Sequence, residues 1–364
     1  MDDHQLIFAR RFKQGQGHLC LNDEWKTRLS PAQRGIVSLG DVAAASPLRL
    51  PPPVTAETRT DLPSISVVIP THKRPALLKR AVQSVIDQDY AGRIEAIVVF
   101  DRSEPTEVGP ADLPPNREIV TLVNGRTPGM AGGRNTGILA ARGDVVAFLD
   151  DDDEWLPLKT TRQVDLLRRG EADAVLSGVR FLAGDRYRDQ PITIPDEDPA
   201  IAAIRTGMYL PIQTLVVWNS VLGSDLLDEA FPGGGDQEFV IRLMMKARVT
   251  SLAEPLVLVN RQHTSRLTMD YEWALANFKY MRAKHRGLIE AAKPDISLAH
   301  ARFALLAFGN RRRRDARMWA TRAVRANPRR LKNWLIALAV VILPPITLDR
   351  IQFVHHRLFW RRLS

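Results

Sequence analysis

The chain has 364 residues, of which 45% are hydrophobic and 25% charged, a composition typical of soluble globular proteins and not of disordered ones. A chain of this length can bury one large core with an appendage, or two cores. Its one cysteine, Cys20, excludes an internal disulfide framework and is compatible with a reducing compartment. We expect no signal peptide, because the first residues are acidic and no apolar stretch follows them.

The positive charge is concentrated at the C-terminal end of the sequence. Residues 302–364 contain 15 lysines and arginines against Asp315 and Asp349, a net charge of +13 in a chain whose total is +10. The preceding residues are therefore close to neutral, at −3. A basic segment attracts anionic membrane surfaces or nucleic acid, and the charge alone fits either partner.

The first part of the chain predicts a strand, a helix and a second strand. Residues 1–62 end in a proline run and are interpreted as an N-terminal extension and linker. Strand-forming residues follow at 65–69, an amphipathic helix at 76–88, and a second strand at 94–100. This βαβ order predicts a parallel sheet.

Polar residues follow three of the predicted strands at their carboxyl ends. Pro70 and Thr71 follow the first strand, Asp101 follows the second, and Asp150 follows a later apolar strand at 145–149. Parallel sheets bind their ligands at the carboxyl ends of the strands. We therefore expect these side chains to share one rim of the sheet.

A glycine-rich segment at 129–137 lies between a third predicted strand, at 119–123, and a short helix at 138–141. Glycines before a helix let the backbone approach an anion, and the N-terminus of the helix favours negative charge. Arg134 adds a guanidinium group that suits phosphate oxygens. A simple connector is the alternative, but the position directly before the acidic strand favours an anion site.

Four aspartates, at 150–153, end the strand at 145–149. Adjacent carboxylates repel one another, so a cation would stabilise them at the end of a buried strand. Oxygen ligands suit Mg²⁺ or Mn²⁺, which share their coordination shell with substrate phosphates. A solvated acidic loop is the alternative, and the neighbouring motifs favour a metal–diphosphate site.

The second half of the sequence adds two candidate functional residues. After a strand predicted at 174–179, the polar, proline-containing residues 184–199 predict a loop. Three glycines then lead into Asp236 at the start of a helix, where the carboxylate either acts chemically or only caps the helix. A strand predicted at 257–263 ends in His263, which is either a ligand or a structural histidine.

The C-terminal region predicts helices, one at 272–292 and a helical hairpin at 298–308 and 314–326. An apolar run follows at 334–343 and stops at two prolines. A membrane-spanning helix needs about 20 residues, so the run and its basic surroundings predict an anchor that lies on the membrane surface. A helix packed against the body of the protein is the alternative.

Three segments in this order resemble the family 2 glycosyltransferases, namely 65–71, 132–137 and 148–157. The resemblance covers residues 64–270 and implies the A-type glycosyltransferase fold. We therefore expect an α/β fold with a Rossmann-like, mainly parallel sheet, helices on both faces, and a C-terminal helical region. The resemblance also implies a metal-dependent, inverting enzyme that moves a sugar from a nucleotide sugar, a UDP-sugar being expected, to an acceptor hydroxyl with Mg²⁺ or Mn²⁺.

The resemblance also implies roles for individual residues. Asp236 would be the general base, with Glu238 as a possible substitute, because Gly235 replaces the glutamate that usually precedes the base. Asp152 would bind the metal ion, and His263 would complete its shell. The residues expected to face the donor are Pro70, Thr71, Arg74, Asp101, Arg134, Asp150 and Asp151.

Two departures from the family pattern, Phe100 in place of an acid and Lys73 in place of asparagine, leave the nucleotide base open. A sugar-phosphate nucleotidyltransferase is a competing interpretation, but residues 70–74 lack its glycines. A non-catalytic nucleotide-sugar-binding module is another, and the retained aspartates argue against it. The tail shows no nucleic-acid-binding motif, so no nucleic acid partner is expected.

The sequence thus predicts four parts: the extension at 1–62, a glycosyltransferase catalytic domain at 63–270, a helical region at 271–332, and a basic, apolar tail at 333–364. The tail predicts a cytoplasmic protein in peripheral contact with the inner face of the membrane. A glycan or lipid-linked acceptor in cell-surface polysaccharide synthesis would agree with this location.

Overall fold

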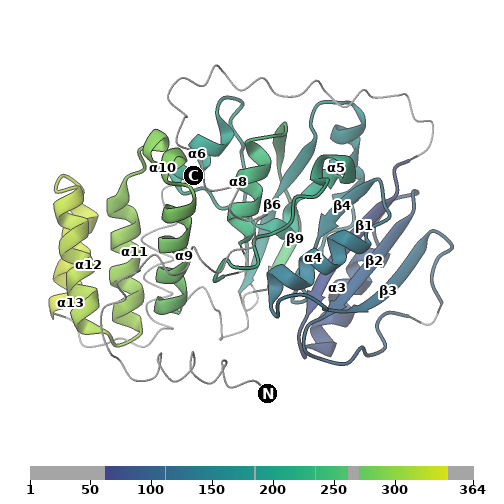
Figure 1. Cartoon of the computed structure of the whole chain (residues 1–364), viewed down its shortest axis with the longest axis horizontal. Helices are drawn as coiled ribbons and strands as arrows, with labels where there is room; N and C mark the ends of the chain where they lie inside the picture. The colour runs from purple at the N-terminus through teal and green to yellow at the C-terminus, as the bar shows by residue number, and fades with distance from the viewer. Residues whose placement is uncertain (1–61, 111, 184–185, 234, 261–269, 343–364) are drawn as a thin grey trace, which may run out of the picture. The chain divides into compact units, whose positions relative to one another are not determined.

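The computed structural model describes residues 62–110, 112–183, 186–233, 235–260 and 270–342, all of which belong to one compact unit. Within these residues, nine strands form one mixed sheet in the order β3-β2-β1-β4-β8-β6-β9-β5, and β7 pairs with β6 (Figure 1). The four parts predicted from the sequence stay predictions, since 1–61 and 343–364 lie outside the described residues.

The strands are β1 (Ile65–Thr71), β2 (Ile94–Phe100), β3 (Arg117–Val123), β4 (Val145–Phe148), β5 (Asp153–Trp155), β6 (Ala174–Ala183), β7 (Arg186–Gln190), β8 (Val216–Trp218) and β9 (Val249–Asn260). The helices are α3 (Pro75–Ile86), α4 (Met130–Ala140), α5 (Lys159–Arg168), α6 (Pro199–Thr206), α7 (Asn219–Leu222), α8 (Asp236–Met244), α9 (Tyr271–Lys284), α10 (Arg286–Ala292), α11 (Ile296–Gly309), α12 (Arg313–Ala326) and α13 (Leu331–Ile342), with a 3₁₀ turn at Ile212–Thr214.

The first half of the sheet is parallel. β1 pairs in parallel with β2 on one side and β4 on the other, and β3 extends the sheet beyond β2. In the second half β8 is antiparallel to both β4 and β6, β5 is antiparallel to β9, and only β6 and β9 are parallel. The predicted α/β class is therefore confirmed, with parallel pairing confined mainly to β1–β4.

Alternating side chains of the central strands bury the sheet on both faces. In β1, Ile65, Val67 and Ile69 face one apolar cluster with α3 and α5, whereas Val68 faces a second cluster with α4 and α8. Period-2 alternation of this kind places successive side chains on opposite faces of a strand. The predicted helical cover on both faces is present.

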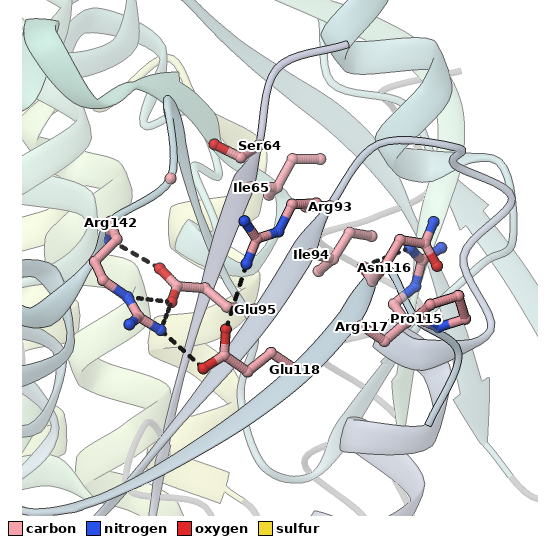
Figure 2. A pocket seen from close by; sticks show the side chains of 11 residues that line it. Ser64, Ile65, Arg93, Ile94, Glu95, Pro115, Asn116, Arg117, Glu118 and Arg142 are labelled. Atoms are coloured by element: carbon pink, nitrogen blue, oxygen red, sulfur yellow. Dashed lines mark hydrogen bonds and ion pairs between the residues drawn. The ribbon is translucent and has the colours of Figure 1, made fainter. Parts of the chain in front are cut away.

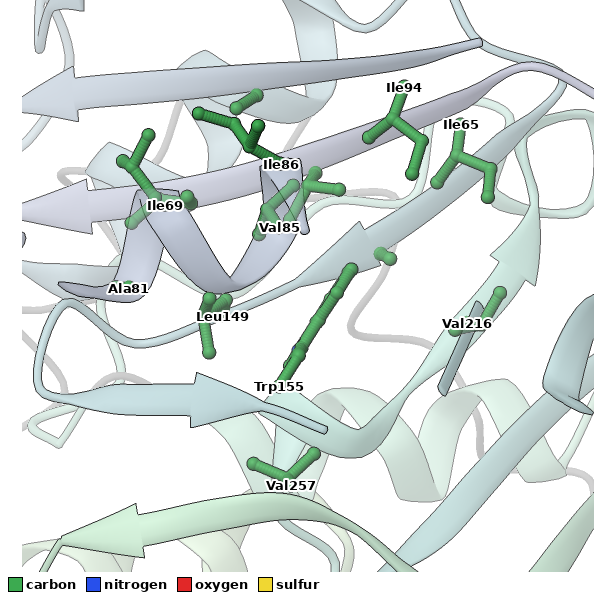
Figure 3. Close-up of a cluster of buried hydrophobic side chains, with 14 of the residues drawn as sticks. Ile65, Ile69, Ala81, Val85, Ile86, Ile94, Leu149, Trp155, Val216 and Val257 are labelled. Atoms are coloured by element: carbon green, nitrogen blue, oxygen red, sulfur yellow. The ribbon is translucent and has the colours of Figure 1, made fainter. Parts of the chain in front are cut away.

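The first cluster shows how α3 is held (Figure 3). Its buried face consists of Leu78, Ala81, Val82, Val85 and Ile86, which recur at helical spacing. Figure 3 shows Val85 and Ile86 of α3 beside Ile65 and Ile69 of β1 and Ile94 of β2. Each large apolar side chain buried in this way contributes about 1.5–3 kcal/mol to stability.

The glycine-rich segment was expected to be a turn before a short helix, and this expectation is wrong. The helix α4 begins at Met130, so most of the glycines lie inside it. Their role is close packing: an added Cβ at Gly137 would lie 2.3 Å from Val68 Cγ1, and one at Gly132 would lie 1.9 Å from the Thr127 carbonyl oxygen. Glycine is needed here because α4 approaches β1 closely.

Two further expectations need correction. The predicted loop at 184–199 contains β7, because Arg180 of β6 forms a bidentate pair with Asp189 and holds an exposed edge strand in place. The predicted single helix at 272–292 is two helices, since His285 takes φ −113 and ψ 37, outside the helical region, between α9 and α10.

The C-terminal helices share a third apolar cluster that includes Phe303, Trp319, Ile336 and Val340. In Figure 1, α11, α12 and α13 lie side by side, and α9 lies between α11 and the sheet. Among the described residues, no helix is both long and apolar enough to cross a membrane.

Candidate active site

The carboxyl ends of the parallel strands bring the predicted site residues to one rim. Thr71 ends β1, Asp101 follows β2, and Asp150 lies just beyond β4. Pro70 of β1 faces α4, where an added Cβ at Gly133 would lie 3.2 Å from the proline Cβ. The structure thus gathers the residues expected to face the donor, whereas His263 lies outside the described residues.

Two of the aspartates are held by the segment that follows β1. Thr71 Oγ1 donates to Asp151 Oδ2 at 2.8 Å, and Arg74 Nη1 donates to Asp151 Oδ1 at 3.2 Å. The same Arg74 nitrogen donates to Asp152 Oδ2 at 3.0 Å. Burial raises the pKa of Asp151, while the Thr71 bond and the Arg74 charge oppose the shift. Since the Arg74 side chain is 45% exposed, its guanidinium can also meet an anionic ligand.

Arg134 links the acidic cluster to the candidate base. The side chain is fully buried, and its Nη2 donates to Asp150 Oδ1 at 2.6 Å while Nη1 donates to Asp236 Oδ1 at 2.8 Å. Burial opposes the charge of Arg134, but Asp236 and Asp150 outweigh burial and raise its pKa. A guanidinium between two carboxylates fixes their positions through charge-assisted hydrogen bonds.

Three carboxylates of the cluster could hold a metal ion. Asp150, Asp152 and Asp153 each offer an oxygen, and these oxygens lie within 4.8 Å of one another. Asp152 was the predicted metal ligand, and Asp150 was expected to face the donor. Asp151 is not part of this group, and its carboxylate is bonded to Thr71 and Arg74 instead.

Asp153 is a candidate ligand that the sequence reasoning did not assign. Its carboxylate accepts hydrogen bonds from Gln213 Nε2 at 2.9 Å and from the Asn260 amide at 3.3 Å. Burial raises the pKa of Asp153, and the charges of Asp150 and Asp152 raise it further. The aspartate run itself could have indicated Asp153 as a ligand. The direction of the Asp153 side chain, however, depends on the pairing of β5 with β9.

Asp101 organises the segment that leads into α4. Its carboxylate accepts hydrogen bonds from Asn124 Nδ2 at 2.8 Å and from the Gly129 amide at 3.1 Å. Burial would raise the pKa of Asp101, but these bonds outweigh burial and lower it. Gly129 precedes α4 with φ 119, a value that favours glycine, and its bond to Asp101 connects the end of β2 to the start of α4.

Asp236 lies at the start of α8, as predicted, and Glu238 follows in the same turn. The Asp236 side chain is 29% exposed, so an acceptor can reach it. Burial raises the pKa of Asp236 to about 6, against the lowering effect of Arg134. Glu238 is only 1% exposed. The geometry therefore favours Asp236 over Glu238 as the base.

Asn135 and Glu229 were also not assigned from the sequence. Asn135 Nδ2 donates to the Leu227 carbonyl at 2.9 Å and to Glu229 Oε1 at 2.8 Å, and its Oδ1 accepts from the Leu227 amide. These bonds connect α4 to the segment that precedes Asp236. Asn135 could have been recognised as a candidate site residue because it is adjacent to Arg134 in the sequence. No motif surrounds Glu229 in the sequence that would have indicated its role.

A cavity of about 220 Å³ lies at the opposite, amino-terminal edge of β1, β2 and β3 (Figure 2). Arg142 binds Glu95 and Glu118 there, both at 2.9 Å, and Arg93 is 3.8 Å from Glu118. These four charged groups form ion pairs with one another, Arg117 donates to backbone carbonyls, and none of the predicted site residues lines the cavity. The candidate active site is the carboxyl-edge rim.

The sequence match to a known family covers most of this rim. Residues 66–221 match the family model described as Glycosyl transferase family 2. They form a family 2 glycosyltransferase domain. The matched residues of this domain include the rim from Thr71 to Asp153, while Asp236 and the helices beyond it lie outside the match.

Curated proteins with similar sequences cover part of the chain. The amylovoran biosynthesis glycosyltransferase AmsB of Erwinia amylovora is 28% identical over 206 residues, which are 53% of this chain and 68% of that protein. The succinoglycan biosynthesis protein ExoW of Rhizobium meliloti is 30% identical over 153 residues, 38% and 48% of the two chains. An uncharacterized glycosyltransferase of Nostoc sp. is 31% identical over 158 residues, 39% and 46% of the two. The chain spans about half the length of the last two relatives.

Two solved structures are also similar to this chain. Residues 1–349 of S. aureus TarS in complex with UDP-GlcNAc have a TM-score of 0.47 and 17% identity, with 76% of this chain and 90% of that chain covered. The mannosyltransferase PcManGT of Pyrobaculum calidifontis, in complex with GDP-Man and Mn²⁺, has a TM-score of 0.46 and 16% identity, with 78% and 81% covered.

Proposed function

We propose that this chain is a glycosyltransferase that moves a sugar from a nucleotide-sugar donor to an acceptor hydroxyl, with inversion at the anomeric carbon. The contact of buried Arg134 with both Asp150 and Asp236 is the observation that carries this proposal. It joins an acidic cluster suited to a metal-bound diphosphate with a carboxylate that can accept a proton. The two groups that sugar transfer needs lie on either side of one guanidinium.

In the proposed reaction, Asp236 accepts the proton of the acceptor hydroxyl while the oxygen attacks the anomeric carbon. The bond between that carbon and the diphosphate oxygen breaks, and the nucleoside diphosphate leaves with the electron pair. Arg74 and Arg134 supply positive charge at the rim, which favours the leaving group as its charge develops. Attack from the side opposite the leaving group inverts the configuration in one step.

The residues present fit a divalent cation. Asp150, Asp152 and Asp153 offer three hard oxygen ligands close together, and Mg²⁺ and Mn²⁺ prefer such ligands. His263 stays a predicted further ligand. When bound, the cation would neutralise charge on the donor diphosphate.

A panel of nucleotide sugars tests the proposed function. The full-length chain is incubated with UDP- and GDP-sugars in the presence of Mn²⁺, Mg²⁺ or a chelator, and release of the nucleoside diphosphate is measured. We expect turnover of at least one donor, with UDP-sugars the first choice, and loss of turnover in the chelator. Absence of turnover with every donor and both cations would overturn the proposal.

The role of Asp152 has its own test. Asp152→Asn removes one charge from the cluster and should abolish metal-dependent donor binding while leaving the fold intact. Calorimetry with the preferred donor and Mn²⁺ measures this. Asp165→Asn is the matched control, because Asp165 of α5 is 48% exposed and pairs with nearby Arg169. Unchanged donor affinity in Asp152→Asn would exclude Asp152 as a ligand.

A glycan or lipid-linked acceptor in polysaccharide synthesis is proposed from the relatives. The names of AmsB and ExoW refer to amylovoran and succinoglycan biosynthesis. A Campylobacter jejuni protein that is 36% identical over 98 residues is named a GalNAc(5)-diNAcBac-PP-undecaprenol beta-1,3-glucosyltransferase. Acceptors of this kind would be attached to a membrane.

The exposed face of α13 supports contact with an anionic membrane surface. One side of this helix packs on its neighbours through Asn333, Ile336 and Val340. The opposite side is apolar and at least half exposed along its length, through Leu331, Trp334, Leu335, Leu338, Val341 and Ile342. An apolar stripe within a strongly basic region suits the boundary between lipid headgroups and acyl chains.

A further inference from the structure

The face of α9 that is turned toward the sheet supports the segment that leads into Asp236. Tyr280 Oη donates to Asp228 Oδ2 at 3.0 Å, and its ring contacts Phe231 with centroids 5.0 Å apart. An added Cβ at Gly233 would lie 2.3 Å from the Asn277 side chain, so the backbone at Gly233 packs directly against α9. Residues that lie outside the matched domain therefore support the loop before the candidate base.

Glu238 connects this support to the helix that carries the base. Its carboxylate Oε1 accepts hydrogen bonds from His285 Nε2 and Arg242 Nε, both at 2.9 Å, and lies 3.1 Å from Lys284 Nζ. Burial would raise the pKa of Glu238, but the His285 bond and the charges of Arg242 and Lys284 outweigh it and lower the pKa to about 2. Glu238 is thus a buried anion that contacts cationic side chains of two helices, α8 and α9, and the imidazole ring of the residue that follows α9.

The first turn of α8 needs such support. Gly235 precedes the helix with φ 69 and has no side chain that could cap the free amides of the first turn. Asp236 and Glu238 are two residues apart, about 200° around the helix, so their side chains point to opposite sides. The turn is held by Arg134 on one side and by His285 on the other.

We propose that Glu238, held by His285 and Lys284, is a positioning residue that fixes the first turn of α8 and thereby directs the Asp236 carboxylate toward the acceptor. The inference rests on the proposed function, in which Asp236 is the base. It also accounts for the break between α9 and α10, because the non-helical backbone of His285 allows its ring to reach Glu238.

Kinetic measurements on two variants test the proposal. Glu238→Gln and His285→Ala should each lower kcat about 10–100-fold, the range expected for a reacting group displaced by about 1 Å. Donor KM should stay close to the wild-type value, because neither residue lies at the donor rim. His285→Gln retains a side-chain donor and should recover most of the activity. The double variant should be no worse than the worse single one, since both changes act on the same contact between Glu238 and His285.

A matched control and a readout independent of activity complete the experiment. Glu290→Gln makes the same chemical change on α10, where Glu290 forms an exposed ion pair with Arg286, and should not alter kcat. Hydrogen exchange of a peptide covering 236–244 should become faster in Glu238→Gln, whereas exchange of β1 should not change. If the 236–244 peptide exchanges as slowly in Glu238→Gln and His285→Ala as in the wild type, and kcat is normal in both, the positioning role is overturned. The proposed sugar transfer would not be affected by that result. Absence of turnover in the wild type would contradict only the proposed function, and the exchange result would still decide the positioning role.

Discussion

Opposing effects of burial and of neighbouring charges set the pKa of the Asp236 carboxylate. Burial raises the pKa of Asp236 to about 6, the charge of Arg134 lowers it, and the charge of Asp150 raises it. A carboxylate with this pKa is ionised at neutral pH and is a better proton acceptor than an ordinary aspartate, so it suits general-base catalysis. Arg134 therefore affects the chemistry at Asp236 as well as its position.

The pH dependence of kcat/KM follows from this arrangement. Protonated Asp236 cannot act as a base, so kcat/KM should fall as the pH drops below about 6. Arg134→Gln removes the charge that lowers the Asp236 pKa, and it should move this fall to higher pH. Arg134→Lys retains the charge and is the control, with a profile close to that of the wild type. An acid limb that does not move in Arg134→Gln would contradict the assignment of Asp236 as the base.

Asp236→Asn should lose about 10²–10⁴-fold in turnover with donor affinity unchanged.

Single residues could be predicted where their environment is local in sequence. Asp150 directly follows the strand predicted at 145–149, and Asp236 directly follows glycines. In the structure Asp150 lies just beyond β4 and Asp236 begins α8. The bond from Arg134 to Asp236 joins residues 102 positions apart, and nothing near either residue indicates it. The direction of Asp153 depends in the same way on β9, which is far along the chain.

At the scale of elements, the glycines of α4 show why a correct motif can give the wrong structure. Glycine has a low helix propensity, so the segment at 129–137 favours a turn when only the sequence is considered. In the fold the same residues are helical, because Gly132 and Gly137 remove side chains from a contact with no room for them. The break at His285 could not be predicted either, since the residue that its ring contacts, Glu238, is 47 positions away in the sequence.

Gly137→Ala tests the close approach of α4 to β1. The added Cβ would lie 2.3 Å from Val68 Cγ1, and a stiff, buried valine cannot move away without cost. We expect a loss of about 1–3 kcal/mol in the free energy of unfolding, measured by denaturant titration. The loss should be smaller in a Val68→Ala background, which removes the clashing methyl groups. Gly125→Ala is the control, because an added Cβ there meets nothing within 4 Å. Equal losses at both glycines would show that the close contact with Val68 is not responsible, because helix propensity and chain entropy both favour alanine over glycine.

At the scale of the whole chain, the parallel half of the sheet was predictable and the mixed half was not. The βαβ order from β1 to β2 is visible in the periodicity of 65–100, and its parallel pairing follows. The antiparallel insertion of β8 between β4 and β6 involves only a few residues of each strand, and short strands give little periodic signal. The basic C-terminal region was visible in the charge, but only the packing of α13 shows which of its side chains are exposed.

These exposed side chains give the last prediction, that α13 holds the protein on an anionic membrane. Leu338→Glu replaces an apolar side chain that is 57% exposed, so it should weaken vesicle binding without disturbing the packed face of the helix. Leu139→Glu on α4 is the matched control, because Leu139 is 61% exposed but lies within the residues that match the family model, away from α13.

Flotation with vesicles that contain anionic phospholipid measures the binding. The wild type and Leu139→Glu should float at low salt, and high salt should release them, because each basic residue near the surface contributes about 1 kcal/mol that salt screens. Removal of all residues after Asn327 should abolish flotation. A wild-type chain that ignores such vesicles at low salt, or a Leu338→Glu variant that binds them equally well, would mean that the apolar face of α13 does not contact lipid.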